Sequence, residues 1–322
     1  MTNNSFDQAA PPVIFIMGPT AVGKTDLALA IAQRFDCGII SVDSAMVYRG
    51  MDIGTAKPDA ATLSAFPHRL IDICDPVDAY SAGRFRSDAL TAIREIIDSG
   101  RLPLLVGGTM LYFRALQNGL ARLPSADPET RSRINEQANQ IGWAALHRRL
   151  QSIDPVAAGR IQPEDSQRIQ RALEVFELTG EPMSELWQRS DPAQFPYRFV
   201  KIVLWPSDRK QLHRRIAARF ERMLQQGFVD EVQELKRDTR LRADLPAMRA
   251  VGYRQIWDYL DGKYDVVQAQ ERGIVATRQL AKRQLTALRR EEDIRSFQVG
   301  DIVPTDNVVS CLRKELAALP RE

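Results

Sequence analysis

Short apolar runs alternate with amphipathic segments along the first third of the chain. Helical spacing of apolar residues predicts helices over 26–35, over 81–99 and after Met110. Between these helices, apolar runs predict buried strands at 13–17, 37–44, 68–76 and 102–106. This alternation is typical of a parallel sheet with right-handed crossovers.

The pattern changes at about residue 124. From there to about residue 191 no strand is predicted, and apolar residues such as Ile134, Ala138 and Ile141 recur at helical spacing. One strand returns at 199–205, helical segments continue to about residue 291, and a short strand and a helix close the chain. We therefore predict an α/β core in two parts, 12–123 and 192–322, separated by an all-helical insertion domain at 124–191.

A glycine-rich loop joins the first predicted strand to the first helix. It consists of Gly18, Pro19, Thr20, Ala21, Val22, Gly23, Lys24 and Thr25. Strand, loop and helix together match the P-loop pattern, whose backbone N–H groups and helix N-terminus form a concave anion site. Lys24 adds a full charge, and the Thr25 hydroxyl suits Mg²⁺. The loop predicts a P-loop NTPase-like sheet that binds a ligand with two or more phosphates.

The composition adds little to this interpretation. The chain has 322 residues, is 44% hydrophobic and 26% charged, and carries a net charge of +3, as ordinary soluble proteins do. Its three cysteines, Cys37, Cys74 and Cys311, are too far apart for a zinc motif or disulfide framework. The first dozen residues do not resemble a signal peptide, and no apolar run reaches the roughly 20 residues that span a bilayer. We therefore expect a cytoplasmic protein, with no membrane segment.

The best apolar strand does not end as it does in most P-loop hydrolases. Those enzymes hold Mg²⁺ with an aspartate at that strand end, whereas here Gly107, Gly108 and Thr109 follow the strand. Asp43 ends the second strand and is expected to face the same crevice, because ligands bind at the carboxyl ends of parallel strands. Asp43, Asp72 or Asp75 could take the metal, but none gives an unambiguous water-activating site. Two kinds of enzyme remain: a small-molecule kinase of the nucleoside or nucleotide type, and a transferase with pyrophosphate as the leaving group.

Positive charge gathers in the last third of the chain, where 207–295 holds 20 Lys/Arg against 14 Asp/Glu. Within it, 276–290 predicts a basic helix whose Arg278, Lys282 and Arg283 form a stripe that fits a phosphodiester backbone. A second basic cluster, 249–254, combines two arginines with Tyr253. The alternative interpretation of the basic helix is a solvated helix face, and that of 249–254 is a helix-entry turn. A third possible function is an RNA-binding P-loop protein without transfer chemistry.

Further motifs run in order along the chain. They are Asp43-Ser44, Val47-Tyr48-Arg49, 52–58 (Asp-Ile-Gly-Thr-Ala-Lys-Pro), Leu70-Ile71-Asp72, Tyr80-Ser81-Ala82, Val106-Gly107-Gly108-Thr109, 167–175 (Gln-Arg-Ile-Gln-Arg-Ala-Leu-Glu-Val), Val251-Gly252-Tyr253 and 277–284 (Thr-Arg-Gln-Leu-Ala-Lys-Arg-Gln). With the P-loop, these motifs resemble the bacterial tRNA dimethylallyltransferases, also called tRNA isopentenyltransferases. Met46 departs from the family, which commonly has Gln there, and Ala287 stands where an aromatic residue is usual.

The resemblance implies a reaction and a set of partners. A dimethylallyl group would move from dimethylallyl diphosphate to N6 of adenosine 37 in tRNAs that read codons starting with U, releasing diphosphate. The P-loop would then hold the donor's diphosphate rather than a nucleotide such as ATP. The insertion would bind the anticodon stem-loop of the tRNA, Mg²⁺ would be the cofactor, and a monomer would suffice.

The resemblance also implies roles for single residues. Asp43 would take the proton from N6, and Thr109 would lie near the donor and the flipped base. The eight loop residues from Gly18 to Thr25, together with Arg219, would bind the diphosphate, with Mg²⁺ on Thr25. Contacts with tRNA are implied for Asp43, Ser44, Ala45, Met46, Arg131, Gln167, Arg168, Ile169, Gln170, Arg171, Arg249, Ala250, Val251, Gly252, Tyr253, Arg254, Arg278, Lys282 and Arg283.

Overall fold

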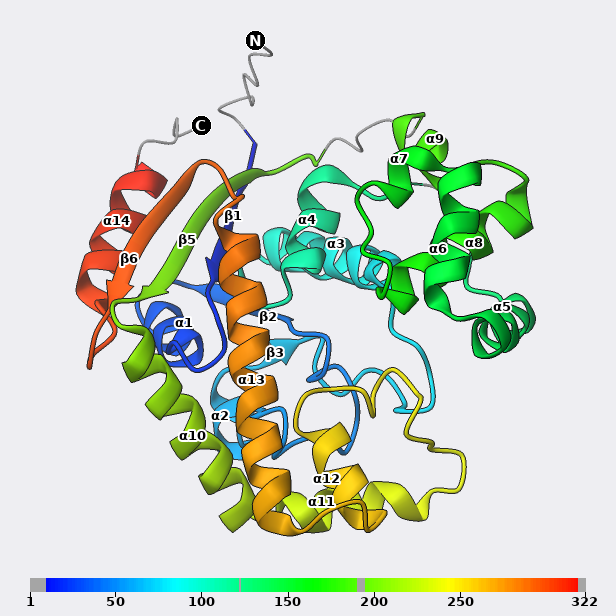
Figure 1. The fold of residues 1–322 in the computed structure, drawn as a ribbon. Coiled ribbons are helices and arrows are strands. Elements are labelled where there is room, and N and C mark those ends of the chain that lie inside the picture. The colour runs from blue at the N-terminus through cyan, green and yellow to red at the C-terminus, as the bar shows by residue number, and fades with distance from the viewer. Residues whose placement is uncertain (1–9, 122, 190–194, 318–322) are drawn as a thin grey trace. The chain divides into compact units, whose positions relative to one another are not determined.

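A computed structural model describes residues 10–121, 123–189 and 195–317 (Figure 1). The described residues form two compact units, one of 10–117 with 195–317 and the other of 118–121 with 123–189. The first unit contains a parallel sheet in the order β3-β2-β4-β1-β5-β6. Its strands are β1 (Pro12–Met17), β2 (Cys37–Val42), β3 (His68–Arg69), β4 (Leu102–Gly107), β5 (Arg198–Pro206) and β6 (Ile294–Val299). The predicted parallel α/β sheet is confirmed.

The central strand β1 explains the two hydrophobic layers of this unit. Alternate residues of a strand face opposite sides, so Val13, Phe15 and Met17 pack into one layer. Ile14 and Ile16 pack into the other. All five side chains are fully buried, as expected for a parallel strand covered by helices on both faces.

Helices cover both faces of the sheet (Figure 1). Side chains of α1 (Lys24–Ala32) and α14 (Thr305–Ala317) belong to the layer of Ile14 and Ile16. Side chains of α3 (Ala82–Asp98) and α4 (Met110–Asn118) belong to the other layer. The short helix α2 (Ala60–Ala65) lies between β2 and β3 in the sequence. Since the connections alternate strand and helix, the loops after β1, β2 and β4 all leave the sheet at its carboxyl edge.

The C-terminal helices extend the layer of Phe15. They are α10 (Arg209–Gln225), α11 (Phe228–Arg237), α12 (Tyr253–Leu260) and α13 (Val266–Leu288). Gly273 lets α13 approach α10 closely, because a Cβ there would lie 2.1 Å from the Phe220 ring. Tight packing of α10 against α13 fixes the positions of the side chains that these two helices direct toward the carboxyl edge of the sheet.

The second unit is helical over its described residues. It contains α5 (Pro128–Ile141), α6 (Trp143–Ile153), α7 (Pro155–Ala158), α8 (Ser166–Thr179) and α9 (Met183–Gln188). The helices pack around a separate apolar core that includes Ile134, Leu146 and Leu173. Asp154, which is 1% exposed, receives hydrogen bonds from the backbone of Ala157 and Ser184 and so joins the starts of α7 and α9.

One strand is shorter than the sequence predicts. A strand was expected over 68–76, but β3 ends at Arg69. Leu70 and Asp72 have φ values of 63° and 56°, which lie in the left-handed region and end the extended conformation. The chain then turns toward Lys57, whose ammonium lies 2.5 Å from an oxygen of Asp72. The rest of the predicted strand is a loop, held by this ion pair and by an isolated parallel bridge between Cys74 and Tyr48.

Candidate functional site

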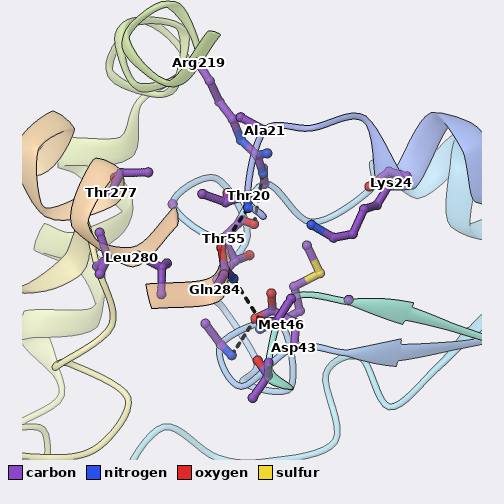
Figure 2. A pocket seen from close by; sticks show the side chains of 18 of the residues that line it. Thr20, Ala21, Lys24, Asp43, Met46, Thr55, Arg219, Thr277, Leu280 and Gln284 are labelled. Carbon is purple, nitrogen blue, oxygen red and sulfur yellow. Dashed lines mark hydrogen bonds between the residues drawn. The ribbon is translucent and has the colours of Figure 1, made fainter. Parts of the chain in front are cut away.

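A cleft of about 1430 Å³ lies at the carboxyl edge of the sheet, within the first unit (Figure 2). Its walls come from the phosphate loop after β1, the segments after β2 and β4, and the helices α10 and α13. Asp43, Thr109 and Arg219, which sequence reasoning placed in one site, all line it. The cleft is large enough for a ligand much bigger than a diphosphate.

The phosphate loop has the backbone conformation that an anion site requires. Gly23 is the N-cap of α1 with a φ of 101°, and Ala21 has a φ of 62°. A Cβ at Gly23 would lie 2.6 Å from a methyl carbon of Val303, so the position excludes a side chain for two reasons. The N-terminus of α1 consequently faces the cleft with its partial positive charge.

Two cations stand beside this loop without a carboxylate partner. Among the described residues, neither Lys24 nor Arg219 forms a salt bridge. Lys24 Nζ donates to the Pro19 carbonyl at 2.7 Å, and Arg219 Nη2 donates to the Thr55 carbonyl over a long 3.5 Å. In Figure 2 the Arg219 side chain extends from its helix toward the phosphate loop at Ala21.

Burial of these cations changes their acidity. Burial, together with the repulsion of Arg219, lowers the pKa of Lys24 to about 7, although Asp43 opposes the change. Burial also lowers the pKa of Arg219, again opposed by the Asp43 carboxylate. A buried charge without a partner costs free energy, and a bound anion would remove that cost. The two side chains therefore form a site that favours a multiply charged anion.

Asp43 follows the last residue of β2 and keeps one oxygen available. Its Oδ1 accepts the backbone N–H groups of Ala45 at 2.8 Å and Met46 at 3.3 Å. Its Oδ2 has no hydrogen bond from any residue that the structure describes. Because the turn fixes the carboxyl group while leaving Oδ2 free, Asp43 can accept a proton from a ligand in the cleft.

Thr109 is held next to Asp43 by the sheet edge. Its N–H donates to the carbonyl of Val42 at 3.3 Å, and its hydroxyl accepts the N–H of Ser44 at 3.2 Å. Gly107 permits this approach, since a Cβ there would lie 2.0 Å from the Val42 carbonyl oxygen. The strand end that lacks an aspartate thus presents a hydroxyl beside the carboxylate.

The loop over 52–57 closes the cleft near Arg219 and is anchored by a carboxylate. Glu231 of α11 accepts the backbone N–H groups of Asp52, Ile53 and Gly54, at 2.9, 2.6 and 3.2 Å. It also accepts the hydroxyl of Tyr253 at 2.5 Å. Burial and this neighbouring carboxylate raise the pKa of Tyr253. These contacts tie the loop, α11 and the start of α12 together.

The residues predicted to contact RNA in this unit differ in exposure. Arg249, Arg254, Lys282 and Arg283 are exposed, and the tRNA-contact prediction for them stays open. Met46, Arg249, Ala250, Val251 and Arg283 line the cleft. Arg278 is partly buried, and its Nε has no hydrogen-bond partner in the described chain. Gly252 and Tyr253 are buried, so a contact with RNA there would involve their backbone.

In the helical unit, a buried glutamate pairs with two of the predicted RNA-binding arginines. Glu174 is fully buried and accepts both Arg131 Nε and Nη2, at 2.8 and 3.1 Å, and Arg171 Nη1 at 2.6 Å. Arg168 pairs with Asp165 at 2.9 Å, and Ile169 is fully buried. Gln167 is exposed, and Gln170 donates to Asn135 at 2.7 Å.

The donors available for a metal ion are few. Over the described residues, no group of three or more His, Cys, Asp or Glu side chains is arranged to hold a metal. Thr25 lies exposed at the start of α1 and lines the same cleft as Asp43. A metal at Thr25 would need most of its ligands from a bound phosphate and from water, which is the usual arrangement for Mg²⁺.

Sequence reasoning missed two residues of the site. Gln284 of α13 accepts the Thr20 N–H at 2.8 Å, and Glu231 anchors the loop described above. Gln284 lies one turn from both Leu280 and Leu288, so it is a polar residue on the apolar stripe of its helix. That position is the sequence signal that could have revealed it. No comparable signal marks Glu231.

Comparison with known proteins gives a consistent result. The model of the family described as IPP transferase matches residues 46–291, and that of isopentenyl transferase matches residues 11–72. The tRNA dimethylallyltransferase of Alkalilimnicola ehrlichii is 62% identical over 89% of this chain and 90% of that protein. That of Thioalkalivibrio sulfidiphilus is 55% identical over 96% of both.

Solved structures show the same relationship. The tRNA isopentenylpyrophosphate transferase of Bacillus halodurans is 37% identical, with a TM-score of 0.69 over 95% of each chain. A eukaryotic dimethylallyltransferase acting on tRNA is 24% identical, with a TM-score of 0.78 over 97% of this chain and 81% of that one, a likeness of fold alone. With one family model covering residues 46–291 and relatives above half identity along nearly the whole length, this chain belongs to the IPP transferase family.

Proposed function

We propose that this protein is a tRNA dimethylallyltransferase that transfers the dimethylallyl group of dimethylallyl diphosphate to N6 of adenosine 37. Its substrates would be tRNAs that read codons starting with U. The observation that carries the proposal is one cleft that holds both an anion-binding loop with two cations and a carboxylate that can accept a proton. Lys24 and Arg219, partly buried and without salt bridges among the described residues, lie beside the phosphate loop, and Asp43 holds a free oxygen in the same cleft.

In this proposal each bond change has a protein group beside it. N6 attacks the first carbon of the dimethylallyl group, the bond from that carbon to the diphosphate oxygen breaks, and the N6 proton moves to Asp43 Oδ2. Charge that develops on the leaving diphosphate is stabilised by Lys24, Arg219 and the N–H groups of the loop. The Thr109 hydroxyl, already beside Ser44, is placed to hydrogen-bond the base or the donor.

Mg²⁺ fits this site as a ligand of the bound diphosphate. Thr25 would supply one hydroxyl oxygen, and Asp43, which lines the same cleft, would be a further ligand through water. When bound, Mg²⁺ would neutralise part of the diphosphate charge. The phosphate loop and the two cations bind the same charge directly, so the chain's own residues already make an anion site.

The RNA would reach the cleft from the side of the basic residues. The exposed Arg249, Arg254, Lys282 and Arg283 would contact its phosphates. An adenine in an anticodon loop must be extruded before N6 can reach the donor. Exposed residues of the helical unit, Gln167 and Arg168 among them, would contact the anticodon stem. Since one chain lines the whole cleft, we propose a monomer, which would work in the cytoplasm where its RNA substrate is.

The direct test is incubation of the purified protein with dimethylallyl diphosphate, Mg²⁺ and unmodified tRNA whose loop contains A36-A37-A38. We expect the tRNA mass to rise by one dimethylallyl unit, located at A37 by nuclease digestion. Turnover of ATP with a nucleoside or nucleotide acceptor, and no mass gain on tRNA, would instead show a P-loop kinase. Binding of tRNA without any transfer would show an RNA-binding protein.

A variant of Asp43 tests the proton acceptor. Asp43→Asn keeps the shape of the turn but cannot take the proton, so the single-turnover rate should fall by roughly 10²–10⁴-fold. The Kd for tRNA should change little. Asp78→Asn, at an exposed carboxylate, is the matched control. An unchanged rate on bound substrate would exclude Asp43 as the base.

A further inference from the structure

Gln284 joins two loops of the cleft that are far apart in the sequence. Its Oε1 accepts the N–H of Thr20 in the phosphate loop at 2.8 Å. Its Nε2 donates to the carbonyl of Gly108 at 3.0 Å. Both functional atoms of one amide are therefore used, and Figure 2 shows the side chain reaching from α13 to the phosphate loop at Thr20.

The fit around this amide is close. A Cβ at Gly108 would lie 2.4 Å from Gln284 Nε2 and 3.3 Å from the Gly18 carbonyl oxygen. The glycine therefore leaves the space that the amide occupies. A side chain that lacked either the acceptor or the donor would leave one backbone group of a cleft loop without this partner.

The helix that carries Gln284 is itself firmly held. Leu285 and Leu288, the next apolar residues on α13, are 8% and 0% exposed. Lys282 and Arg283 lie on the exposed side of the same turn. One turn of α13 thus carries two exposed cations, of which Arg283 also lines the cleft, and an amide that bonds the two loops of the cleft.

We propose that Gln284 is a positioning residue that fixes the distance between the phosphate loop and the Gly107–Thr109 loop. The proposal rests on the proposed transfer function. The phosphate loop places the reacting carbon of the donor, and the second loop places Thr109 beside Asp43. Transfer needs the attacking nitrogen within about 3–3.5 Å of that carbon, so a small drift between the loops lowers the rate.

The first test replaces the amide without changing its size. Gln284→Met removes both hydrogen bonds, and we expect a single-turnover rate about 10- to 100-fold lower. The Kd for tRNA and the thermal midpoint should change little, because Gln284 bonds only the backbone of two loops and the cations of the basic surface stay in place. Gln284→Asn, which is shorter by one methylene and cannot reach both partners, should give the same loss. Gln233→Met, at an exposed glutamine of α11, is the matched control.

A double-mutant cycle separates positioning from general packing. In a Thr109→Val background the effect of Gln284→Met on the rate should shrink to less than about 3-fold, because the placement of the hydroxyl no longer matters. If the two losses multiply instead, Gln284 acts independently of the Thr109 loop and the proposal is wrong.

Hydrogen exchange supplies a readout that does not depend on transfer. In Gln284→Met the amides of 18–21 and of 107–110 should exchange faster, while those of the sheet stay protected. Unchanged exchange in both loops would overturn the proposal even in an active enzyme. If exchange is faster in Gln284→Met but the wild-type protein transfers nothing to tRNA, Gln284 still connects the two loops. That result would reject the proposed transfer function and not the connection.

Discussion

The cations at the phosphate loop and two arginines of the helical unit differ in whether a carboxylate pairs with them. Lys24 and Arg219 donate hydrogen bonds only to backbone carbonyls among the described residues. Arg131 and Arg171 share a fully buried glutamate, Glu174. Burial alone would raise the pKa of Glu174, but hydrogen bonds from both arginines and from the Asp127 N–H lower it.

This difference separates charge kept for a ligand from charge used in folding. A buried cation without a counterion is stabilised only when an anion arrives, so it marks a binding site. An arginine already paired with a buried carboxylate contributes to stability and has less capacity left for a phosphate. By this measure we expect the phosphate loop to bind an anion, and part of the helical unit's positive charge to serve stability.

The largest effect should follow the loss of Arg219. Arg219→Gln removes a cation beside the leaving diphosphate, so kcat/KM should fall by about 10²–10³-fold, as for other single groups that stabilise developing charge. The thermal midpoint should stay level or rise, because a partly buried charge without a salt bridge is lost. Steady-state kinetics and thermal unfolding test both parts. Arg214→Gln, on the exposed face of α10, is the control. A variant of Arg219 that is less stable but fully active would contradict the distinction between cations kept for a ligand and arginines used for stability.

The matching change in the helical unit should mainly lower stability. Glu174→Gln leaves Arg131 and Arg171 without their carboxylate and should lower the free energy of unfolding by about 2–3 kcal/mol. Because the folded pKa of Glu174 is lowered, its stabilisation is present above pH 4.5 and is lost as the pH falls through the folded pKa. Denaturant titration at pH 7 and below pH 4 measures this. Glu181→Gln, which breaks the exposed pair with Arg189, should cost less than about 1 kcal/mol.

A smaller effect is expected at the basic surface of α13. Replacing Lys282 and Arg283 with Gln should weaken tRNA binding by about 10-fold and reduce the magnitude of the slope of log K against log salt by up to about 2. Filter binding at several salt concentrations gives both values. The control is the pair Arg313→Gln and Lys314→Gln, exposed on α14, which removes the same charge. An unchanged slope in the first variant would place the RNA on another surface.

The smallest effect concerns Lys24 and pH. Its pKa is about 7 in the folded protein against 10.5 ordinarily, so its charge destabilises the fold most below pH 7. This cost disappears as the pH rises from 7 to 10.5. Lys24→Met should therefore raise the thermal midpoint by a few degrees at pH 6.5 and by less at pH 9.5. Added pyrophosphate should stabilise the wild type more than the variant. Lys210→Met, exposed on α10, should show no such dependence on pH.

The local parts of the site could be predicted from sequence, and the distant parts could not. The phosphate loop and Asp43 follow from short motifs beside apolar strands, and they line the cleft as predicted. Arg219 carries no local signal and came only from the family resemblance. Gln284 and Thr20 are 264 positions apart, so their contact depends on how α13 packs across the sheet. The end of β3 at Arg69 likewise depends on Lys57 and the backbone after it, not on apolar pattern.

The position of β1 in the sheet has a consequence for synthesis of the chain. β1 pairs with β4 on one side and with β5 on the other. About 90 residues separate the end of β4 from the start of β5, so at roughly 5–20 residues per second the ribosome needs about 5–20 s to supply the second partner. During that time one edge of an apolar strand has no neighbour, a state prone to pairing with other chains. The helical unit is synthesised in this interval. The rate of its synthesis therefore sets how long one edge of β1 remains unpaired.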